Sequence, residues 1–254
     1  MDVDLDGLDG LEARVAPTRR PAGPAQGLQQ WRHLLFVHWE VPVSVLRPLI
    51  PPALEVDTYK GRAFVGLVPF TMRNVRPFRF LPAVPGTADF HETNVRTYVR
   101  RAGRGDPGPG VWFFSLDAAS RLAVLAARTF FHLPYYHADM DLQVDGAKVS
   151  YRSERRSGAA RLQLRYEIGE PLPASEPGTL QFFLAERYYL YTLDSQRRLV
   201  RGQVHHPPYP LHGATVDELS ESLIAAAGVQ KGAPLPLTLY SPGVDVEIFG
   251  LERV

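Results

Sequence analysis

The sequence predicts one α+β domain that is mostly antiparallel β-sheet, with two or three short helices. Many short runs alternate apolar and polar residues, turns rich in Gly, Pro and Asp separate them, and few segments have helical spacing. No repeat or linker interrupts residues 28–254, so we expect a single domain there. Residues 1–27 mix acidic residues with the segment P-A-G-P-A-Q-G and offer little to bury. They are predicted to form a flexible tail, and a short helix over Leu5–Val15 is the alternative.

The overall composition is that of an ordinary globular protein. Charged residues make up 22% and hydrophobic residues 45% of the chain, and the net charge of +1 provides no field to attract nucleic acid or an anionic membrane. No apolar run approaches the roughly 18–20 residues of a membrane span. The first residues are acidic, unlike a secretory signal, and the lack of cysteine excludes disulfides, thiolate catalysis and zinc–thiolate sites. We expect a cytoplasmic protein without a nucleic-acid or membrane partner.

The first core segment begins at the aromatic run W-R-H-L-L-F-V-H-W-E-V. Its composition predicts a strand over Trp31–Val41, and Pro42 with the residues after it predicts a short helix over Val43–Ile50. Leu54–Asp57 and Ala63–Met72 then have the composition of two strands separated by a turn, which predicts a β-hairpin.

The segment Phe90–Val99 is predicted to be the central strand. A Gly/Pro-rich turn separates it from Val111–Leu116, so the two are expected to pair as a hairpin. Asp117 is a candidate N-cap for the clearest helix of the chain, Ala118–Phe131. One stripe of this helix holds Leu122, Leu125, Ala126 and Thr129.

The second half of the chain is predicted to be mainly strands. Met140–Val144, Lys148–Glu154 and Arg161–Ile168 are separated by turn residues, and Leu180–Thr192 is expected to pair with Arg197–His206.

A second helix and a last strand complete the prediction. Thr215 and Glu218 have capping-box spacing at the start of Thr215–Ala227, which Gly228 would end. Val244–Leu251 then reads as a strand.

A polar face on the central strand is the strongest candidate site. Side chains alternate between the two faces of a strand, so Glu92, Asn94 and Arg96 share one face and Val95 lies on the other. Arg96, assisted by Asn94, would bind a carboxylate, and Glu92 would act as a general acid or base. The alternative is an internal Glu–Arg pair that only fixes the strand register.

Further candidates lie on other predicted strands. Arg32 and His38 would share one face of the first strand and reach the site, although an aromatic core strand with charged ends is the alternative. Tyr188 would bind substrate or simply pack in the core. His205 or His206, at a strand end that two prolines terminate, would line a cavity as a second acid or base.

The sequence points to no metal site and no cofactor. Metal sites need about three convergent ligands, and the eight histidines show no such spacing. An imine-forming amine has three candidates, Lys60, Lys148 and Lys231, and none lies in the apolar surroundings that lower the pKa of an amine.

Six segments together resemble one known family. They read W-R-H-L-L-F-V-H-W-E-V-P, F-H-E-T-N-V-R-T-Y-V, G-V-W-F-F-S-L-D-A, L-A-E-R-Y-Y-L-Y-T, V-H-H-P-P-Y-P-L and S-P-G-V-D-V-E-I-F-G-L. They resemble the YqjF-like proteins, uncharacterised proteins of bacteria, over about Trp31–Leu251. That family is similar in fold to acetoacetate decarboxylase, which implies a double-sheet β-barrel around a small buried site.

The resemblance also suggests roles for individual residues. D-F-H-E occupies the place of the decarboxylase motif P-Y-x-E, so Glu92 takes the position of its cavity glutamate. H-L-P-Y-Y occupies the place of G-F-P-K-K, so Tyr135 stands at the position of the reactive lysine and Tyr136 beside it. Both tyrosines are therefore candidates for hydrogen bonding in catalysis, or they form an aromatic plug. Without the amine no imine can form, which makes acetoacetate decarboxylase activity itself unexpected.

These observations predict an internal polar cavity that takes a small keto or hydroxy acid. The chemistry would be that of a lyase, hydratase or decarboxylase-like enzyme that works without a Schiff base. The alternative is a non-catalytic binding protein that keeps the fold and not the chemistry. Exposed edges of the sheet would also allow a homo-oligomer.

Overall fold

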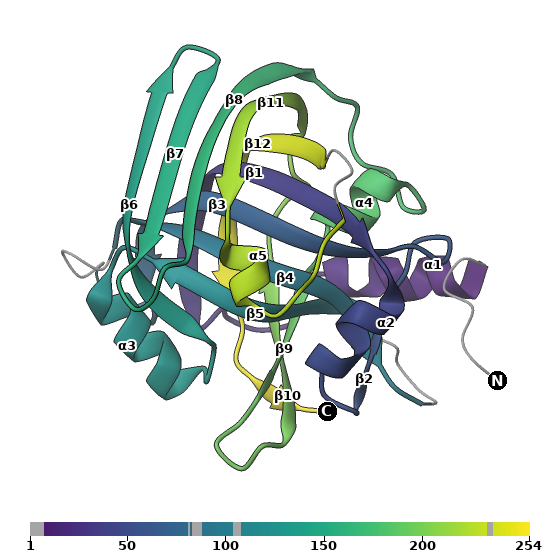
Figure 1. Ribbon diagram of the computed structural model, residues 1–254. Coiled ribbons are helices and arrows are strands. Elements are labelled where there is room, and N and C mark those ends of the chain that lie inside the picture. Colours follow the sequence, from purple (N-terminus) through teal and green to yellow (C-terminus); the bar gives the residue numbers. More distant parts are fainter. Residues whose placement is uncertain (1–7, 81, 83–87, 104–107, 233–235) are drawn as a thin grey trace.

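The protein is built mainly of β-strands, as the sequence predicts (Figure 1). The computed structural model describes all residues except 1–7, 81, 83–87, 104–107 and 233–235. The strands are β1 (Gly27–Val41), β2 (Leu54–Val56), β3 (Ala63–Arg76), β4 (Phe90–Arg101), β5 (Gly110–Ala118), β6 (Tyr135–Asp145), β7 (Lys148–Arg155), β8 (Arg161–Pro171), β9 (Tyr189–Leu193), β10 (Leu199–His205), β11 (His212–Glu221), β12 (Leu237–Ile248) and β13 (Glu252–Arg253).

The helical segments are short. None of them, in the described part of the chain, is long and apolar enough to cross a membrane. They are α1 (Leu8–Val15), η1 (Ala16–Thr18), α2 (Val43–Leu46), η2 (Arg47–Leu49), α3 (Arg121–Phe130), α4 (Leu180–Ala185) and α5 (Leu223–Ala226).

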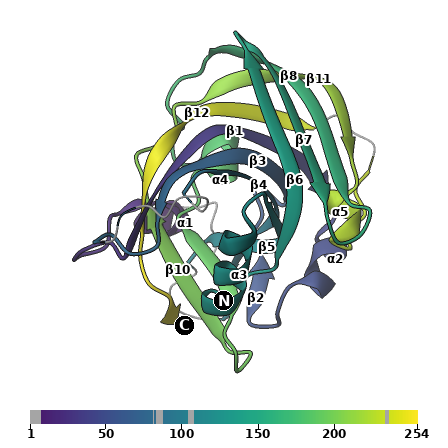
Figure 2. The ribbon, with the colours of Figure 1, turned by 90° about the vertical axis from the view of Figure 1, so that its left-hand side faces the viewer.

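The strand pairings close on themselves twice. Among the described residues, one closed circuit of paired strands runs through β5, β6, β7, β8, β11, β12, β1, β3 and β4 and back to β5. We call this circuit the large ring. β10 and β9 form a second route from β12 to β5, and this closes the small ring of β12, β1, β3, β4, β5, β9 and β10. The five strands β12, β1, β3, β4 and β5 are thus a wall shared by both rings. Figure 2 shows β12, β1 and β3 curving side by side in this wall.

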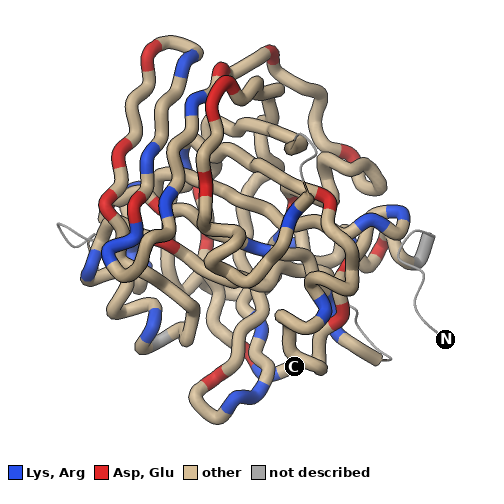
Figure 3. The backbone as a smooth tube through the Cα atoms, viewed as in Figure 1, with Lys and Arg blue, Asp and Glu red and all other residues tan. Residues whose placement is uncertain are grey.

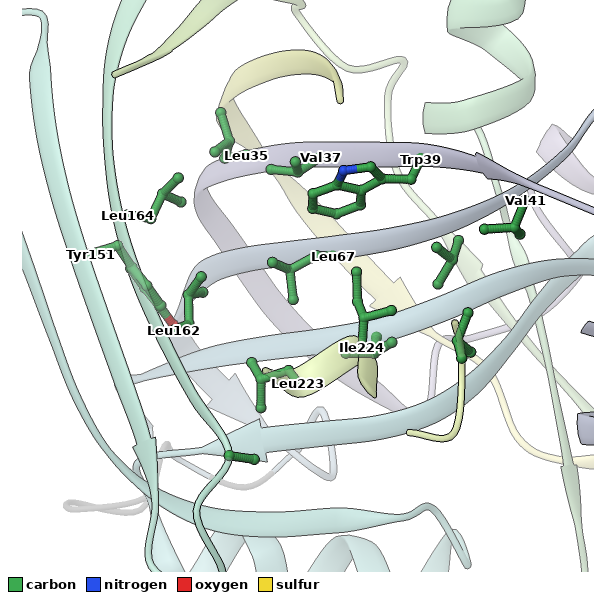
Figure 4. Close-up of a cluster of buried hydrophobic side chains, with 14 of the residues drawn as sticks. Leu35, Val37, Trp39, Val41, Leu67, Tyr151, Leu162, Leu164, Leu223 and Ile224 are labelled. Carbon is green, nitrogen blue, oxygen red and sulfur yellow. The ribbon is translucent and has the colours of Figure 1, made fainter. Parts of the chain in front are cut away.

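The shared wall is buried on both faces. Along β1, Leu35 and Val37 belong to the core of the large ring, whereas Leu34 and Phe36 belong to the core of the small ring. Such a strand is a near-continuous apolar run, which explains the L-L-F-V sequence. In Figure 4 the large-ring core comprises side chains of β1, β3, β7, β8 and α5. The labelled residues are Leu35, Val37, Trp39, Val41, Leu67, Tyr151, Leu162, Leu164, Leu223 and Ile224.

The outer strands β6, β7 and β8 follow the simpler pattern of a sheet with one wet face. Buried and exposed residues alternate along β7 and β8. Acidic and basic residues are interspersed along these strands (Figure 3), so neighbouring charges offset each other.

Several predicted elements are confirmed. Val43–Ile50 is helical as α2 and η2, Phe90–Val99 is a strand within β4, and it forms a hairpin with β5, in which Val99 pairs with Gly110. The three strands predicted between residues 140 and 168 are β6, β7 and β8.

The predicted helix Thr215–Ala227 is wrong over most of its length. Residues up to Glu221 form β11, which pairs with β8, and only α5 is helical. The register shifts between Val216 and Glu218. Such a bulge lets Val216 and Leu219, three residues apart, both pack on the large-ring core, so a bulged strand imitates helical spacing.

The predicted hairpin of Leu54–Asp57 with Ala63–Met72 is also wrong. β2 pairs with β4 instead, and a local bridge between Tyr59 and Arg62 turns the chain into β3. Asp57 is drawn into the interior, where it is 1% exposed and binds two arginines.

The helix that follows β5 differs from the prediction at its start. Its N-cap is Ser120, whose hydroxyl accepts from the backbone N–H of Ala123. Asp117 instead lies buried at the end of β5 and pairs with Arg155 at 2.6 Å. The predicted stripe is not buried, since Leu125 is 63% exposed. Likewise the first part of Leu180–Thr192 is the helix α4, and only β9 is a strand.

Part of residues 1–27 is helical and packs against the rest of the protein; residues 1–7 lie outside the described part, and the flexibility of this segment stays a prediction. Residues 8–18 are helical, and Arg14 is 7% exposed. Its guanidinium contacts Asp57 at 2.8 Å, and Arg187 of the α4–β9 connection contacts the same carboxylate at 2.7 Å. Burial opposes ionisation of Asp57, but the two guanidinium groups outweigh it and lower the pKa of this carboxyl. The N-terminal helix is therefore attached to the core by a buried ionic cluster.

The close approach of β12 to β1 generates the first testable prediction. Gly243 has φ of +134°, and a Cβ there would overlap the carbonyl oxygen of Trp31. Gly243→Ala should lower the free energy of unfolding by at least about 2 kcal/mol in urea denaturation. The matched control is Gly213→Ala in β11, where a Cβ would meet nothing within 4 Å; it should change that free energy by less than about 1 kcal/mol. Equal effects of the two substitutions would contradict the steric explanation.

Candidate functional site

The polar face of β4 points into the small ring. Glu92, Asn94 and Arg96 are 1%, 5% and 8% exposed. Val95, on the opposite face, packs in the core of the large ring. The alternation predicted from the sequence is therefore present, and it places three polar side chains in the interior.

Glu92 is bound by a tyrosine of the neighbouring strand β6. The Tyr135 hydroxyl donates to Glu92 Oε2 over 2.9 Å. Burial raises the pKa of Glu92 to about 8, the Tyr135 hydrogen bond lowers it in part, and the carboxylate of Asp117 raises it further. Glu92 is thus mostly a neutral acid at pH 7, with a pKa near the working pH that suits proton transfer.

The backbone of Glu92 is held from the other ring. Tyr151 of β7 donates its hydroxyl to the Glu92 carbonyl oxygen over 3.0 Å and accepts from the Thr93 hydroxyl over 3.0 Å. These bonds fix the strand from the large-ring side and leave the Glu92 carboxyl free to face the small ring.

Arg96 has no acidic partner among the residues that the structure describes. Its Nη2 donates to the carbonyl oxygen of Leu184 over 3.0 Å and to the Tyr98 hydroxyl over 3.4 Å. Its Nε has no hydrogen-bond partner within that part of the chain. A buried cation that only neutral groups contact is costly, and an anion would offset that cost.

His38 of β1 joins the same interior network. Its Nε2 lies 2.5 Å from the Tyr98 hydroxyl, which also donates to the carbonyl oxygen of Leu184 over 2.7 Å. Burial, with the charges of Arg96 and Arg187 adding to it, holds the pKa of His38 well below its usual value. A Cβ on the facing residue 66 would press on the imidazole, so glycine at that position makes room for it.

A groove of about 480 Å³ lies where β1 ends and β3 begins. His38 is among its lining residues, with Glu40, Arg62 and Leu237. His38 is thus shared between this groove and the small-ring interior.

A histidine, a tyrosine and a glutamate form a second cluster inside the small ring. The imidazole of His206 stacks on Tyr188 with ring centroids 4.4 Å apart. The Tyr188 hydroxyl donates to Glu186 Oε2 over 2.7 Å, and the Tyr209 backbone N–H donates to Oε1 over 2.9 Å. Burial raises the pKa of Glu186 despite these hydrogen bonds.

Arg32 does not reach the site. The register of β1 against β3 shifts after Arg32, and His33 has φ of +52°. This bulge reverses the alternation, so Trp31 packs on the small-ring core and Arg32 turns away to pair with Asp245 at 2.5 Å. The prediction that Arg32 and His38 share a face fails for this reason.

Tyr136 and His205 also lie elsewhere. Tyr136 points away from Tyr135 and stacks under the Arg155 guanidinium, 3.7 Å from the ring centroid. His205 lies 3.5 Å from the carboxylate of Glu247. Of the two adjacent histidines, the buried one is His206.

Tyr98 was not among the predicted site residues. It lies on the same face of β4 as Glu92, and the two-residue period of a strand was enough to place it there. Glu186 was also not among the predicted site residues. Strand period places Tyr188 on the same face as Glu186, and the Tyr188 hydroxyl does donate to this glutamate, whereas its other partners, Ser175 and Tyr209, come from separate segments.

The three lysines lie away from this site. Lys60 and Lys148 are exposed, and Lys231 is paired with Glu221 at 3.0 Å and lies over the Trp39 ring. Within the described residues no group of three or more His, Asp or Glu side chains could hold a metal ion.

Comparison with known proteins identifies relatives in sequence and in fold. A family model named DUF2071 and described as an uncharacterized conserved protein matches residues 28–245. The uncharacterized protein YqjF of Bacillus subtilis (strain 168) is 41% identical over 227 residues, which cover 89% of this chain and 91% of YqjF. The predicted resemblance is confirmed.

Solved structures show the fold. Acetoacetate decarboxylase from Legionella pneumophila has a TM-score of 0.62 at 14% identity and covers 94% of this chain and 92% of its own. The enduracididine biosynthesis enzyme MppR, complexed with pyruvate, has a TM-score of 0.62 at 11% identity, over 92% of this chain and 93% of its own. The predicted acetoacetate-decarboxylase-like fold is confirmed.

The raised pKa of Glu92 predicts a specific pH dependence of stability. Between the ordinary pKa of 4.5 and the folded value of about 8, the folded state holds a proton that the unfolded state has lost. Raising the pH through this window should therefore lower the free energy of unfolding, by up to about 1.4 kcal/mol per pH unit. Glu92→Gln cannot titrate and should remove this contribution. Urea denaturation of both proteins at several pH values measures it, and parallel curves for the two would contradict the assignment.

Proposed function

Because the chain belongs to the DUF2071 family of uncharacterized conserved proteins and has the acetoacetate-decarboxylase-like fold, we propose that it binds a small keto or hydroxy acid inside the small ring and acts on it without a Schiff base. The observation that carries this proposal is the buried charge of Arg96, which has no acidic partner among the residues that the structure describes. A carboxylate beside Arg96 would supply the missing anion and accept from its unpaired Nε.

The polar residues of β4 are spaced along one face of the strand. A strand rises about 3.3 Å per residue, so the backbone positions of Glu92 and Arg96 lie about 13 Å apart, with Asn94 midway. An acid whose carboxylate meets Arg96 would direct its other end towards Asn94 and Glu92. Asn94 Oδ1 lacks a hydrogen-bond partner among the described residues and would bind the ligand in the middle.

Glu92 would be the group that transfers a proton. Its carboxyl is buried, contacts Tyr135 and has a pKa raised to about 8, so both protonation states are accessible near neutral pH. Tyr135 occupies the position that the family resemblance assigns to the reactive lysine. Its phenol would donate a hydrogen bond and could form no imine, so the chemistry would be acid–base chemistry of a lyase or hydratase type.

The fold neighbours are consistent with this class of ligand. One is named acetoacetate decarboxylase and the other is complexed with pyruvate, and both names refer to keto acids. At 14% and 11% identity these proteins share the fold, and the ligand class is our extension to this chain.

Arg96→Met tests the carboxylate anchor. Without ligand the variant should be at least as stable as the wild type, because an unpaired buried cation is replaced by an apolar side chain. With an acid at about 100 times its dissociation constant, the wild type should gain roughly 2.7 kcal/mol and the variant nothing. Thermal unfolding against pyruvate, acetoacetate, lactate and 3-hydroxybutyrate measures both effects. Arg101→Met, on the same strand, is the matched control and should respond like the wild type; loss of response in both variants would contradict the assignment.

Deuterium exchange tests the role of Glu92 without knowledge of the product. In D2O the wild type should exchange the protons next to the carbonyl of a bound keto acid, faster as the pH rises and Glu92 ionises. Glu92→Gln should slow this exchange by at least about 100-fold. Proton NMR follows the signal loss, with a protein-free sample as the blank. Binding of the acid without exchange would instead favour the non-catalytic binding protein.

A further inference from the structure

His206 carries an unused hydrogen-bond acceptor in the interior of the small ring. The side chain follows the end of β10 and is 2% exposed. Its Nδ1 lies 2.8 Å from the carbonyl oxygen of Pro207. A carbonyl only accepts, so Nδ1 bears the proton of the neutral ring and Nε2 bears a lone pair. Nε2 has no hydrogen-bond partner among the described residues.

The imidazole is fixed in place and cannot turn to another partner. It stacks on Tyr188 at 4.4 Å and contacts Tyr209 at 4.6 Å between ring centroids. Two nearby donors are engaged elsewhere, because the Tyr188 hydroxyl and the Tyr209 backbone N–H both donate to Glu186. Within the described residues the lone pair of Nε2 receives no donor.

His206 and Arg96 belong to the same interior. A chain of contacts connects them, from Arg96 to the Phe36 ring at 5.5 Å, from Phe36 to Tyr209 at 5.3 Å and from Tyr209 to His206 at 4.6 Å. Burial lowers the pKa of His206 to about 4 although the Pro207 carbonyl favours its protonated form; the charges of His205 and Arg96 lower it further. The ring is thus neutral at physiological pH, and a ligand that reached both side chains would meet one cation and one neutral imidazole.

Building on the proposed function, we infer that the ligand is a hydroxy acid whose hydroxyl donates to His206 Nε2 while its carboxylate accepts from Arg96. A keto oxygen only accepts, so a keto acid in the same place would leave Nε2 unpaired against another lone pair. Asn94 Oδ1, on the same strand as Arg96, is a second acceptor without a partner among the described residues. The Asn94 side chain can rotate so that its NH2 group takes the place of its oxygen, and it could then donate. In His206 the contact of Nδ1 with the Pro207 carbonyl oxygen fixes Nε2 as the acceptor. His206 is therefore the residue that would select the hydroxyl.

Matched acid pairs test this inference on the unaltered protein. Calorimetric titration compares lactate with pyruvate and 3-hydroxybutyrate with acetoacetate, using both enantiomers of each hydroxy acid. The better enantiomer should bind about 5- to 10-fold more tightly than its keto partner, the effect of one hydrogen bond made or left unmade. Keto acids that bind as tightly or more tightly would overturn the inference and leave the proposed acid site standing. If no acid of either kind binds, the proposed function fails and the inference fails with it.

Substitution of His206 provides an independent test. His206→Phe keeps an aromatic ring between Tyr188 and Tyr209 and removes the acceptor, so the preference for the hydroxy acid should fall to about 1-fold while keto-acid affinity is retained. His205→Phe, the neighbouring residue that faces Glu247, is the matched control and should keep the wild-type ratio. An unchanged preference in His206→Phe would show that another group selects the hydroxyl.

Discussion

The wall shared by the two rings is the constraint on which the rest of the structure depends. Both of its faces are buried along the middle of its strands, so a side chain there enters one ring or the other. Its backbone N–H and C=O groups are largely used in strand pairing and leave few partners for polar side chains. The polar residues of β4 therefore enter the interior of the small ring and interact with the few groups that α4 and β6 bring to them.

The buried arginines of the protein differ in whether a carboxylate pairs with them. Elsewhere the chain compensates buried arginines with aspartate: Arg155 pairs with Asp117 at 2.6 Å, and Arg14 and Arg187 share Asp57. Arg96 is contacted by neutral groups alone within the described residues, and the nearby Glu92 is held neutral by its burial. The other buried arginines of the described residues are paired with aspartate and Arg96 is not, and this contrast favours a binding role for Arg96 over a structural one.

The absence of a lysine from this site defines what chemistry remains. Tyr135 contacts Glu92 from the strand that follows α3, and the three lysines of the chain lie elsewhere. A phenol and a carboxyl can exchange protons with a ligand but cannot hold it covalently as an imine. In our proposal the site performs non-covalent acid–base chemistry, and its donor and acceptor pattern selects the ligand.

The sequence by itself determined the fold class, most of the strands and the face of β4 on which Glu92, Asn94 and Arg96 lie. These features are local, because strand period and turn residues specify them without reference to distant parts of the chain. Its errors have a common origin. The bulge at His33 turned Arg32 away from the site, and the bulge in β11 imitated a helix; both depend on the register of neighbouring strands. Only the tertiary structure decided that Arg96 has no acidic partner in the described part of the chain and that His206, in place of His205, is the buried histidine, since whether a buried polar atom is paired depends on segments far apart in the chain.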